Sequence, residues 1–190
     1  HDPAAHKFAA SIAIAFIPAA ILGFFFHSTI KFYLFNPVSV AVALIVGGIA
    51  MILIEKHMPP RQIGSQPDVN FKQALLIGMA QCLSLVPGVS RAASTIMGGV
   101  LCGLDRKSAT EFSFFLAIPI IIAASFYDLF KNFDLLNKDD FLILFFGSVT
   151  AYISALLIIK IFIRYVAHNN FIGFGWYRIM VGIITLFYFY

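Results

Sequence analysis

The sequence predicts an all-α, polytopic membrane protein with about five transmembrane helices and one re-entrant helical hairpin. Its 190 residues are 61% hydrophobic and only 12% charged, about half the charged fraction of a soluble domain. The apolar residues form uninterrupted runs close to the ~20 residues that an α-helix needs to cross ~30 Å of hydrocarbon. This composition excludes a soluble enzyme, a disordered chain and a disulfide scaffold. A net charge of +4 is too dilute for a nucleic-acid-binding surface.

Five apolar runs are long enough to span a bilayer, and residues 1–190 are expected to form a single membrane domain. Polar joints rich in Pro, Gly, Ser and Asp separate the runs, as is typical of helix ends. Ser108 followed by Glu111 predicts a capping box at one start. Asn137, with Asp139 and Asp140, places negative charge at the start of the next helix. The predicted spans are residues 8–26, 38–54, 108–130, 141–163 and 171–190.

A sixth apolar segment, residues 71–104, does not have the pattern of a single span. Its two arms, residues 71–86 and 95–104, flank the polar sequence PGVSRAAS at 87–94. Arms of about 16 and 10 residues reach only part of the way through a bilayer. The segment is therefore predicted to enter the membrane and return to the same side.

The distribution of basic residues favours this topology, because loops retained in the cytoplasm carry an excess of Lys and Arg. With a re-entrant segment, or with two short full crossings as the alternative, one face has eight basic residues and the other has three; a single crossing would give six against five. The loop at 55–70 and the Arg106-Lys107 pair are therefore expected in the cytoplasm, with the hairpin tip directed towards the opposite face. The eight are Lys7, Lys56, Arg61, Lys72, Arg106, Lys107, Lys160 and Arg164, and the three are Lys31, Lys131 and Lys138.

The hairpin tip carries residue types that bind phosphate. The break at Gly88 leaves backbone amides without helical partners, which is tolerated at membrane depth only in protein or beside a wet cavity. Ser90, Ser94 and Thr95 supply hydroxyls. Arg91 supplies a guanidinium that binds phosphate oxygens in a forked geometry, and the following helix N-terminus attracts the same anion. An anion site is the preferred interpretation. A purely structural hairpin, with an arginine that pairs internally or snorkels, is the alternative.

Residues 87–99, PGVSRAASTIMGG, and the sequence EFSF at 111–114 resemble the second signature of the bacterial undecaprenyl-diphosphatase family, the bacitracin-resistance type. The resemblance extends more loosely over nearly the whole chain, including FGWYR at 174–178. It implies a multi-pass hydrolase of the bacterial cytoplasmic (inner) membrane that converts undecaprenyl diphosphate to undecaprenyl phosphate and inorganic phosphate. That reaction recycles the lipid carrier for peptidoglycan and other cell-wall glycans and confers bacitracin resistance.

The same resemblance implies roles for the tip. Arg91 and Ser90 would be the catalytic residues, and Gly88, Ser94 and Thr95 would join them in binding the substrate phosphates. Arg91 would hold the diphosphate and stabilise charge that develops on the transferred phosphoryl group. Ser90 and Thr95 would donate hydrogen bonds to it.

The chain departs from the family pattern in two places. Ala92-Ala93 stands where the family usually has Ser-Gly. We expect this difference to alter how the loop binds phosphate without abolishing activity. The first family signature, an acidic motif followed by PVSSTGH, is missing, and NPVS at 36–39 only echoes its start. Cleavage of a phosphoanhydride needs a nucleophile or activated water, usually with a carboxylate-held divalent cation. The chain is therefore expected to be N-terminally truncated, to hold half of an inverted repeat, and to be inactive alone. The implied Mg²⁺ or Ca²⁺ would have no ligand in it.

The expected partners are a polyprenyl diphosphate lipid and the membrane, with a homodimer as a further option and no nucleic acid. A transporter or flippase of anionic polyprenyl lipids is the alternative function, since the same hairpin could bind a head group without hydrolysing it. A non-catalytic partner protein is a third. Of the other ionisable groups, Glu111 is interpreted as a cap and Asp128 as an interfacial residue. Arg178, beside Trp176 and Tyr177, is interpreted as a snorkelling arginine in an aromatic belt, with a second buried cation as the alternative.

Overall fold

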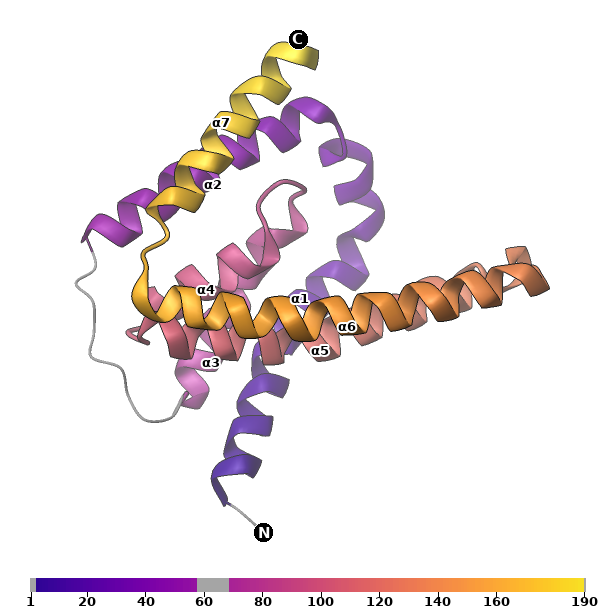
Figure 1. Cartoon of the computed structure of the whole chain (residues 1–190), viewed down its shortest axis with the longest axis horizontal. Helices are drawn as coiled ribbons and strands as arrows, with labels where there is room; N and C mark the ends of the chain where they lie inside the picture. The colour runs from indigo at the N-terminus through magenta and orange to yellow at the C-terminus, as the bar shows by residue number, and fades with distance from the viewer. Residues whose placement is uncertain (1–2, 58–68, 190) are drawn as a thin grey trace.

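The computed structural model describes residues 3–57 and 69–189, and over these ranges the chain is built from helices without strands (Figure 1). Five of the described helices, α1, α2, α5, α6 and α7, are long and apolar enough to cross a membrane. The all-α class and the five predicted spans are therefore confirmed. The elements in order are α1 (Pro3–Leu34), α2 (Pro37–His57), α3 (Phe71–Cys82), the 3₁₀ helix η1 (Leu83–Leu85), α4 (Arg91–Leu101), α5 (Arg106–Lys131), the 3₁₀ helix η2 (Phe133–Leu135), α6 (Lys138–His168) and α7 (Ile172–Phe189).

The long helices extend beyond the apolar runs that predict them. α1 contains 32 residues instead of the predicted 8–26, so the helix continues through most of the polar residues expected to separate the first two spans. Only two residues separate α1 from α2, and Asn36 Oδ1 accepts a hydrogen bond from Ser39 N at 2.9 Å. α6 contains 31 residues and ends at His168. Hydropathy locates the apolar part of a helix but not its polar ends, where backbone hydrogen bonding continues into the interface.

The start of α5 differs from the predicted capping box. The helix begins at Arg106, and the Asp105 carboxylate accepts hydrogen bonds from Ser108 N at 3.0 Å and from Ser108 Oγ at 2.6 Å. Glu111 instead forms an ion pair with Lys107 at 3.8 Å, so its predicted capping role is wrong. A carboxylate at the N-cap satisfies the first amides and also interacts with the helix dipole, which explains why Asp105 takes the position. At the start of α6, where the sequence predicts only negative charge, Asn137 and Asp140 form a capping box.

Residues 71–104 are interrupted as predicted. α3 has 12 residues and α4 has 11, or about 18 and 16 Å of helix, too short to cross ~30 Å of hydrocarbon. The two helices pack against each other, joined by η1 and a loop at 86–90. A capping box between Asn70 and Gln73 fixes the start of α3. The segment is a helical hairpin whose loop forms its tip.

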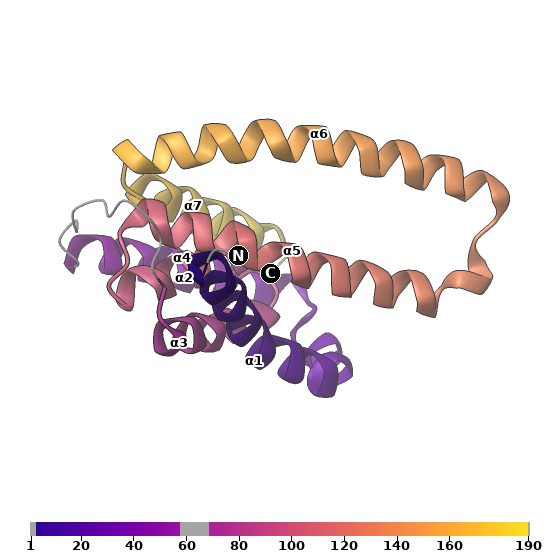
Figure 2. The ribbon, with the colours of Figure 1, turned by 90° about the horizontal axis from the view of Figure 1, so that it is seen from below.

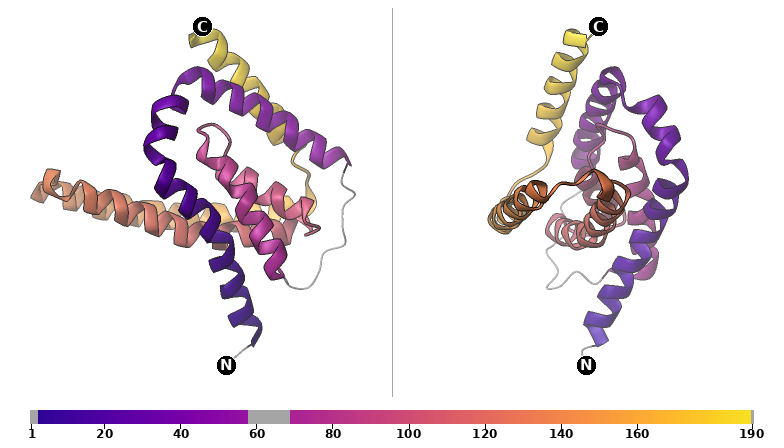
Figure 3. Two further views of the ribbon diagram at one scale, coloured as in Figure 1. Left: turned by 180° about the vertical axis from the view of Figure 1, so that it is seen from behind. Right: turned by 90° about the vertical axis from the view of Figure 1, so that its right-hand side faces the viewer.

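The hairpin lies in the middle of the molecule. α2 and α7 form the most extensive helix pair, which crosses near the tip, while α1 packs on α3 (Figure 1; Figure 3, left). α5 and α6 run antiparallel and project together beyond the remaining helices (Figure 2). The tip is thus surrounded by helices from both ends of the chain.

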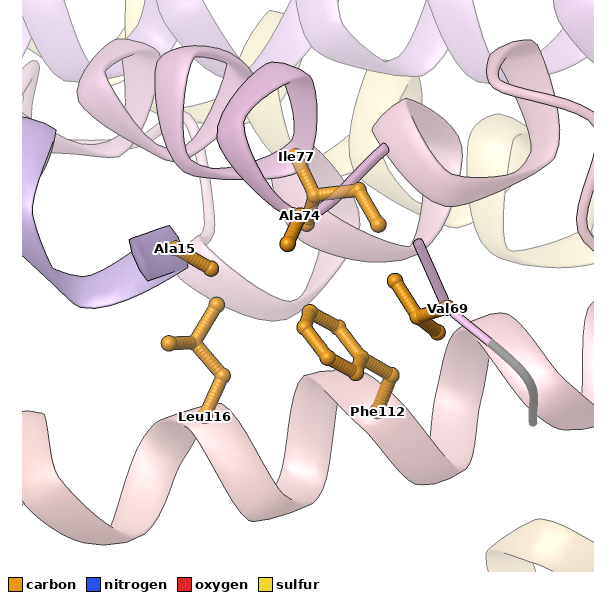
Figure 4. Packing of buried hydrophobic residues seen from close by; sticks show 6 residues of the cluster. All are labelled: Ala15, Val69, Ala74, Ile77, Phe112 and Leu116. Atoms are coloured by element: carbon orange, nitrogen blue, oxygen red, sulfur yellow. The ribbon is translucent and has the colours of Figure 1, made fainter. Parts of the chain in front are cut away.

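One buried cluster anchors the hairpin to α1 and α5 (Figure 4). Phe112 of α5 and Ile77 of α3 are both fully buried, and Ser11 of α1 donates a hydrogen bond to Val69 O at 2.9 Å. Because lipid is as apolar as these side chains, close packing rather than water exclusion holds such a contact together. The cluster consists of Ala15, Val69, Ala74, Ile77, Phe112 and Leu116.

An ion pair joins the end of α2, which precedes the hairpin, to the start of α5, which follows it. Glu55, near the end of α2, is 8% exposed, and its Oε1 accepts a hydrogen bond from Arg106 Nε at 2.6 Å as well as contacting Nη2. Most of the loop predicted at 55–70 lies outside the described residues. A contact between Glu55 and Arg106 nevertheless fits a segment that returns to its starting side and does not fit a single crossing.

Candidate active site

The tip loop has an unusual backbone. Gly88 has φ 94°, and Ser90, with φ 69° and ψ 115°, is the only non-glycine residue with positive φ in the described ranges. Such a conformation costs about 1–3 kcal/mol and persists only where its surroundings hold it. Ser90 is the N-cap of α4, and its exposed side chain accepts a hydrogen bond from Ala93 N at 3.3 Å. The strain lies in one of the two residues predicted to be catalytic.

Gly88 also lies against α2. A Cβ atom at this position would be 2.5 Å from Val40 O and 3.1 Å from the Ala43 side chain. The left-handed φ and this close approach both require glycine. The tip is therefore pressed onto the backbone of α2.

Arg91, the first residue of α4, is half-buried between the hairpin and α5. Its Nη1 donates a hydrogen bond to Ser113 O at 2.8 Å, its one hydrogen bond within the described residues. A guanidinium has five N–H groups, so most of them stay available to a ligand. Arg91 lines a cavity of about 410 Å³ together with Gln81, Ser84 and apolar side chains of α1 and α5. It is the one charged residue among those that line this cavity.

The hydroxyls of Thr95 and Ser94, which were also predicted to bind phosphate, do not line the cavity of Arg91. Thr95 is fully buried; its Oγ1 lies 2.6 Å from Ser113 Oγ and also contacts Arg91 O at 3.0 Å. Ser94 donates to Ser90 O at 3.1 Å and lines a second, mostly apolar cavity of about 590 Å³ between α2 and the hairpin. The predicted site residues therefore lie in or next to one loop, but Arg91 and Ser94 line different cavities. Their predicted phosphate contacts stay predictions.

Gln81 is a polar residue of this site that the sequence reasoning missed. Its side chain is 1% exposed, and neither Oε1 nor Nε2 has a hydrogen-bond partner among the described residues. It lines the same cavity as Arg91, and Ser84 Oγ donates to its backbone carbonyl at 2.7 Å. Burying an amide without partners costs free energy, so such a group in a cavity is a candidate ligand contact. The signal in the sequence was a glutamine in the interior of an apolar arm, between Ala80 and Cys82.

Arg178 does not lie at an interface, and the snorkelling interpretation is wrong. Its side chain is 7% exposed, while Trp176 and Tyr177 beside it are exposed. Arg178 Nη2 donates to Gly88 O at 2.9 Å and, more weakly, to Ala43 O at 3.5 Å. A second guanidinium therefore reaches the hairpin tip from α7, because α7 is packed along α2 with this side chain directed inwards.

The described residues do not fit a divalent cation. In residues 3–57 and 69–189, no group of three or more His, Cys, Asp or Glu side chains is close enough to hold a metal ion. Glu55 is paired with Arg106, Glu111 with Lys107, and Asp105 caps α5. The Mg²⁺ or Ca²⁺ implied by the resemblance stays a prediction.

Comparison with known proteins decides the family. The profile described as "Bacitracin resistance protein BacA" matches residues 1–184. The undecaprenyl-diphosphatase of Nitrosomonas eutropha is 51% identical over 182 residues, which cover 96% of this chain and 67% of that protein. The chain belongs to the bacitracin resistance protein BacA family. The match includes the whole hairpin and its tip.

Other relatives in the BacA family are similar to the chain to a similar extent. The undecaprenyl-diphosphatase of Methylobacillus flagellatus is 46% identical over 195 residues, which cover 100% of this chain and 72% of that protein. Undecaprenyl-diphosphatase 2 of Shewanella oneidensis is 47% identical over 185 residues, covering 96% of this chain and 69% of that protein. The chain thus spans about two thirds of the length of these relatives. With its five apolar helices, it is a multi-pass membrane protein.

Proposed function

We propose that this protein is a phosphatase that hydrolyses undecaprenyl diphosphate to undecaprenyl phosphate and inorganic phosphate. The observation that carries the proposal is the Arg91 guanidinium, which lines a cavity of about 410 Å³ together with Gln81, whose side-chain amide has no partner among the described residues. Relatives that are 46–51% identical to the chain over the aligned residues are named undecaprenyl-diphosphatase. This name supports hydrolysis over the transporter or flippase alternative.

The cavity offers complementary chemistry for a lipid diphosphate. Arg91 supplies charge-assisted hydrogen bonds to phosphate oxygens, and its bond to Ser113 O holds the guanidinium in place. Gln81 Nε2, which has no partner among the described residues, is proposed to donate to another oxygen. The apolar walls from α1 and α5, including Phe16 and Ile120, suit the first isoprene units. Fixed donors in a largely apolar surrounding stabilise charge on the transferred phosphoryl group more strongly than water does.

Ser90 is proposed to act at the entrance of the site. It is exposed, and its hydroxyl accepts from Ala93 N, which leaves its own proton free to donate to a phosphate oxygen. The strained backbone fixes where this hydroxyl points. Thr95, in contrast, is proposed to support Arg91 from behind, since its hydroxyl contacts both Ser113 and Arg91 O.

The membrane placement is also a proposal. We infer that the protein resides in the bacterial cytoplasmic membrane, with the Glu55–Arg106 end in the cytoplasm and the tip directed towards the opposite face. The ion pair between these residues and the excess of basic residues at this end support it. A homodimer and the inverted repeat implied by the family resemblance stay predictions.

The test is phosphate release from undecaprenyl diphosphate by the complete protein in detergent. We expect Arg91→Ala to abolish release and Arg91→Lys to retain a small part, because lysine keeps the charge but not the forked geometry. Lys131→Ala, an exposed change at the end of α5, is the matched control and should be neutral. Undiminished release by Arg91→Ala would refute the role of Arg91. Lipid translocation without any phosphate release by the unaltered protein would favour the transporter.

A further inference from the structure

Arg178 is a buried cation without an acidic partner. Its side chain is 93% buried, its Nε makes no hydrogen bond, and no carboxylate of the described residues forms an ion pair with it. Placing a guanidinium inside a membrane protein is costly, so residues of this kind are retained for a reason other than packing. The hydrogen bonds that it makes go to two backbone carbonyls, Gly88 O at 2.9 Å and Ala43 O at 3.5 Å.

Glycines at the contact between α2 and α7 leave room for the Arg178 guanidinium to reach the hairpin tip. A Cβ atom on Gly47 would collide with Arg178 Nη2. At the next residue, a Cβ on Gly48 would be 2.6 Å from Gly175 O, so the two helices approach with backbone against backbone. Glycines at these positions allow α7 to lie close enough for Arg178 to reach past α2.

The carbonyl that Arg178 binds belongs to the most strained part of the chain. Gly88 lies two residues before Ser90, and both have positive φ. A loop carbonyl at membrane depth needs a hydrogen-bond donor, and a strained conformation needs neighbours that hold it. Val40 blocks the loop on one side and Arg178 provides the donor.

We propose that Arg178 is a positioning residue of the phosphatase site, which clamps the hairpin tip through the Gly88 carbonyl and so holds Ser90 and Arg91 in their working geometry. The inference rests on the proposed function for its kinetic consequence, but the clamp itself is a structural claim. Arg178 touches the loop and not the cavity of about 410 Å³ that Arg91 lines.

Two variants test the clamp by different routes. Arg178→Ala removes the donor, and Gly47→Ala keeps every charge but places a methyl group where the guanidinium lies. Gly147→Ala and Gly173→Ala are matched controls, since a Cβ at either position meets nothing within 4 Å. Arg178→Lys is the conservative variant, because an ammonium can still donate to a carbonyl.

The first readout is steady-state phosphate release from undecaprenyl diphosphate. Arg178→Ala and Gly47→Ala should each lower kcat at least tenfold while KM changes less than threefold, and Arg178→Lys should recover part of the loss. The controls should match the unaltered protein. A rise in KM of tenfold or more at unchanged kcat would overturn the proposal, because it would make Arg178 a substrate-binding group.

The second readout does not depend on activity. In a chain whose free cysteines Cys82 and Cys102 are replaced by serine, Val89→Cys in the tip is labelled with a maleimide in detergent, with and without Arg178→Ala, Arg178→Lys or Gly47→Ala. We expect labelling to become at least threefold faster when the clamp is lost. An unchanged rate in all three backgrounds would overturn the proposal, even if kcat falls. If the unaltered protein releases no phosphate, the proposed function fails and the labelling still decides the clamp. If Arg178→Ala does not fold, the other two variants decide both readouts.

Discussion

Replacing Gln81 by leucine should make the protein more stable and less active. The Gln81 side chain is 1% exposed, and both of its polar atoms lack partners among the described residues. A buried polar group without a hydrogen bond costs about 1–3 kcal/mol. Leucine has a similar volume and no polar atom, so Gln81→Leu should raise the free energy of unfolding by about 1–3 kcal/mol. For a chain of this size, that corresponds to about 2–4 °C in Tm for each kcal/mol.

The same change should weaken catalysis if the amide contacts the diphosphate. Loss of one hydrogen bond to a charged group removes about 1.5–3 kcal/mol, a decrease of roughly 10- to 150-fold in kcat/KM. Thermal unfolding in detergent and phosphate release are the two assays. A gain in stability paired with a loss of function is typical of residues retained for activity.

Gln73→Leu is the matched control for this experiment. Gln73 Nε2 donates to Cys102 O at 3.0 Å, and its Oε1 accepts from Asn70 N at 3.0 Å. The same chemical change should therefore lower stability by about 1 kcal/mol or more, because it breaks two hydrogen bonds. If Gln81→Leu also lowers Tm and leaves phosphate release unchanged, the amide is a packing group and the reasoning about this cavity is wrong.

Three further changes follow from contacts around the hairpin. Thr95→Val should destabilise the protein by about 1–3 kcal/mol, since it leaves the Ser113 hydroxyl without its partner at 2.6 Å; chemical unfolding would show no change if the pair is unimportant. Glu55→Gln should lower Tm, and Glu55→Gln with Arg106→Gln should recover part of the loss, because the single change leaves a partly buried charge unpaired; additive losses would argue against the pair. Ser90→Gly should relieve about 1 kcal/mol of backbone strain yet reduce phosphate release, and equal activity would show that the hydroxyl has no catalytic role.

Much of the fold could be predicted because hydropathy and helix length are local properties. The five spans and the interruption of residues 71–104 follow from runs of apolar residues and from the Pro-Gly break. The ends of the helices could not be located as well, because α1 continues through polar residues after Phe26 and α5 starts at Arg106 under the Asp105 cap. Those boundaries depend on single hydrogen bonds rather than on composition.

The site could be predicted only where its residues are neighbours in the sequence. Ser90 and Arg91 share the tip and were found from their residue types. Ser94 and Thr95 are also neighbours, but successive residues of an α-helix point about 100° apart, so their hydroxyls lie on different faces of α4 and have different partners. Arg178 is 90 residues from Gly88, and its aromatic neighbours have the pattern of an interfacial belt. Only the packing of α7 on α2 shows where its side chain lies.

Equilibrium binding of a polyprenyl methylenebisphosphonate, a diphosphate analogue without a cleavable anhydride, tests most directly whether the hairpin tip grips a lipid diphosphate. Isothermal titration calorimetry of this analogue with the complete protein and with the Arg91→Ala variant measures binding without turnover. Charge-assisted bonds worth about 1.5–3 kcal/mol predict that Arg91→Ala raises Kd roughly 10- to 150-fold. An unchanged Kd for Arg91→Ala, in a variant that unfolds at the same temperature as the unaltered protein, would contradict the account.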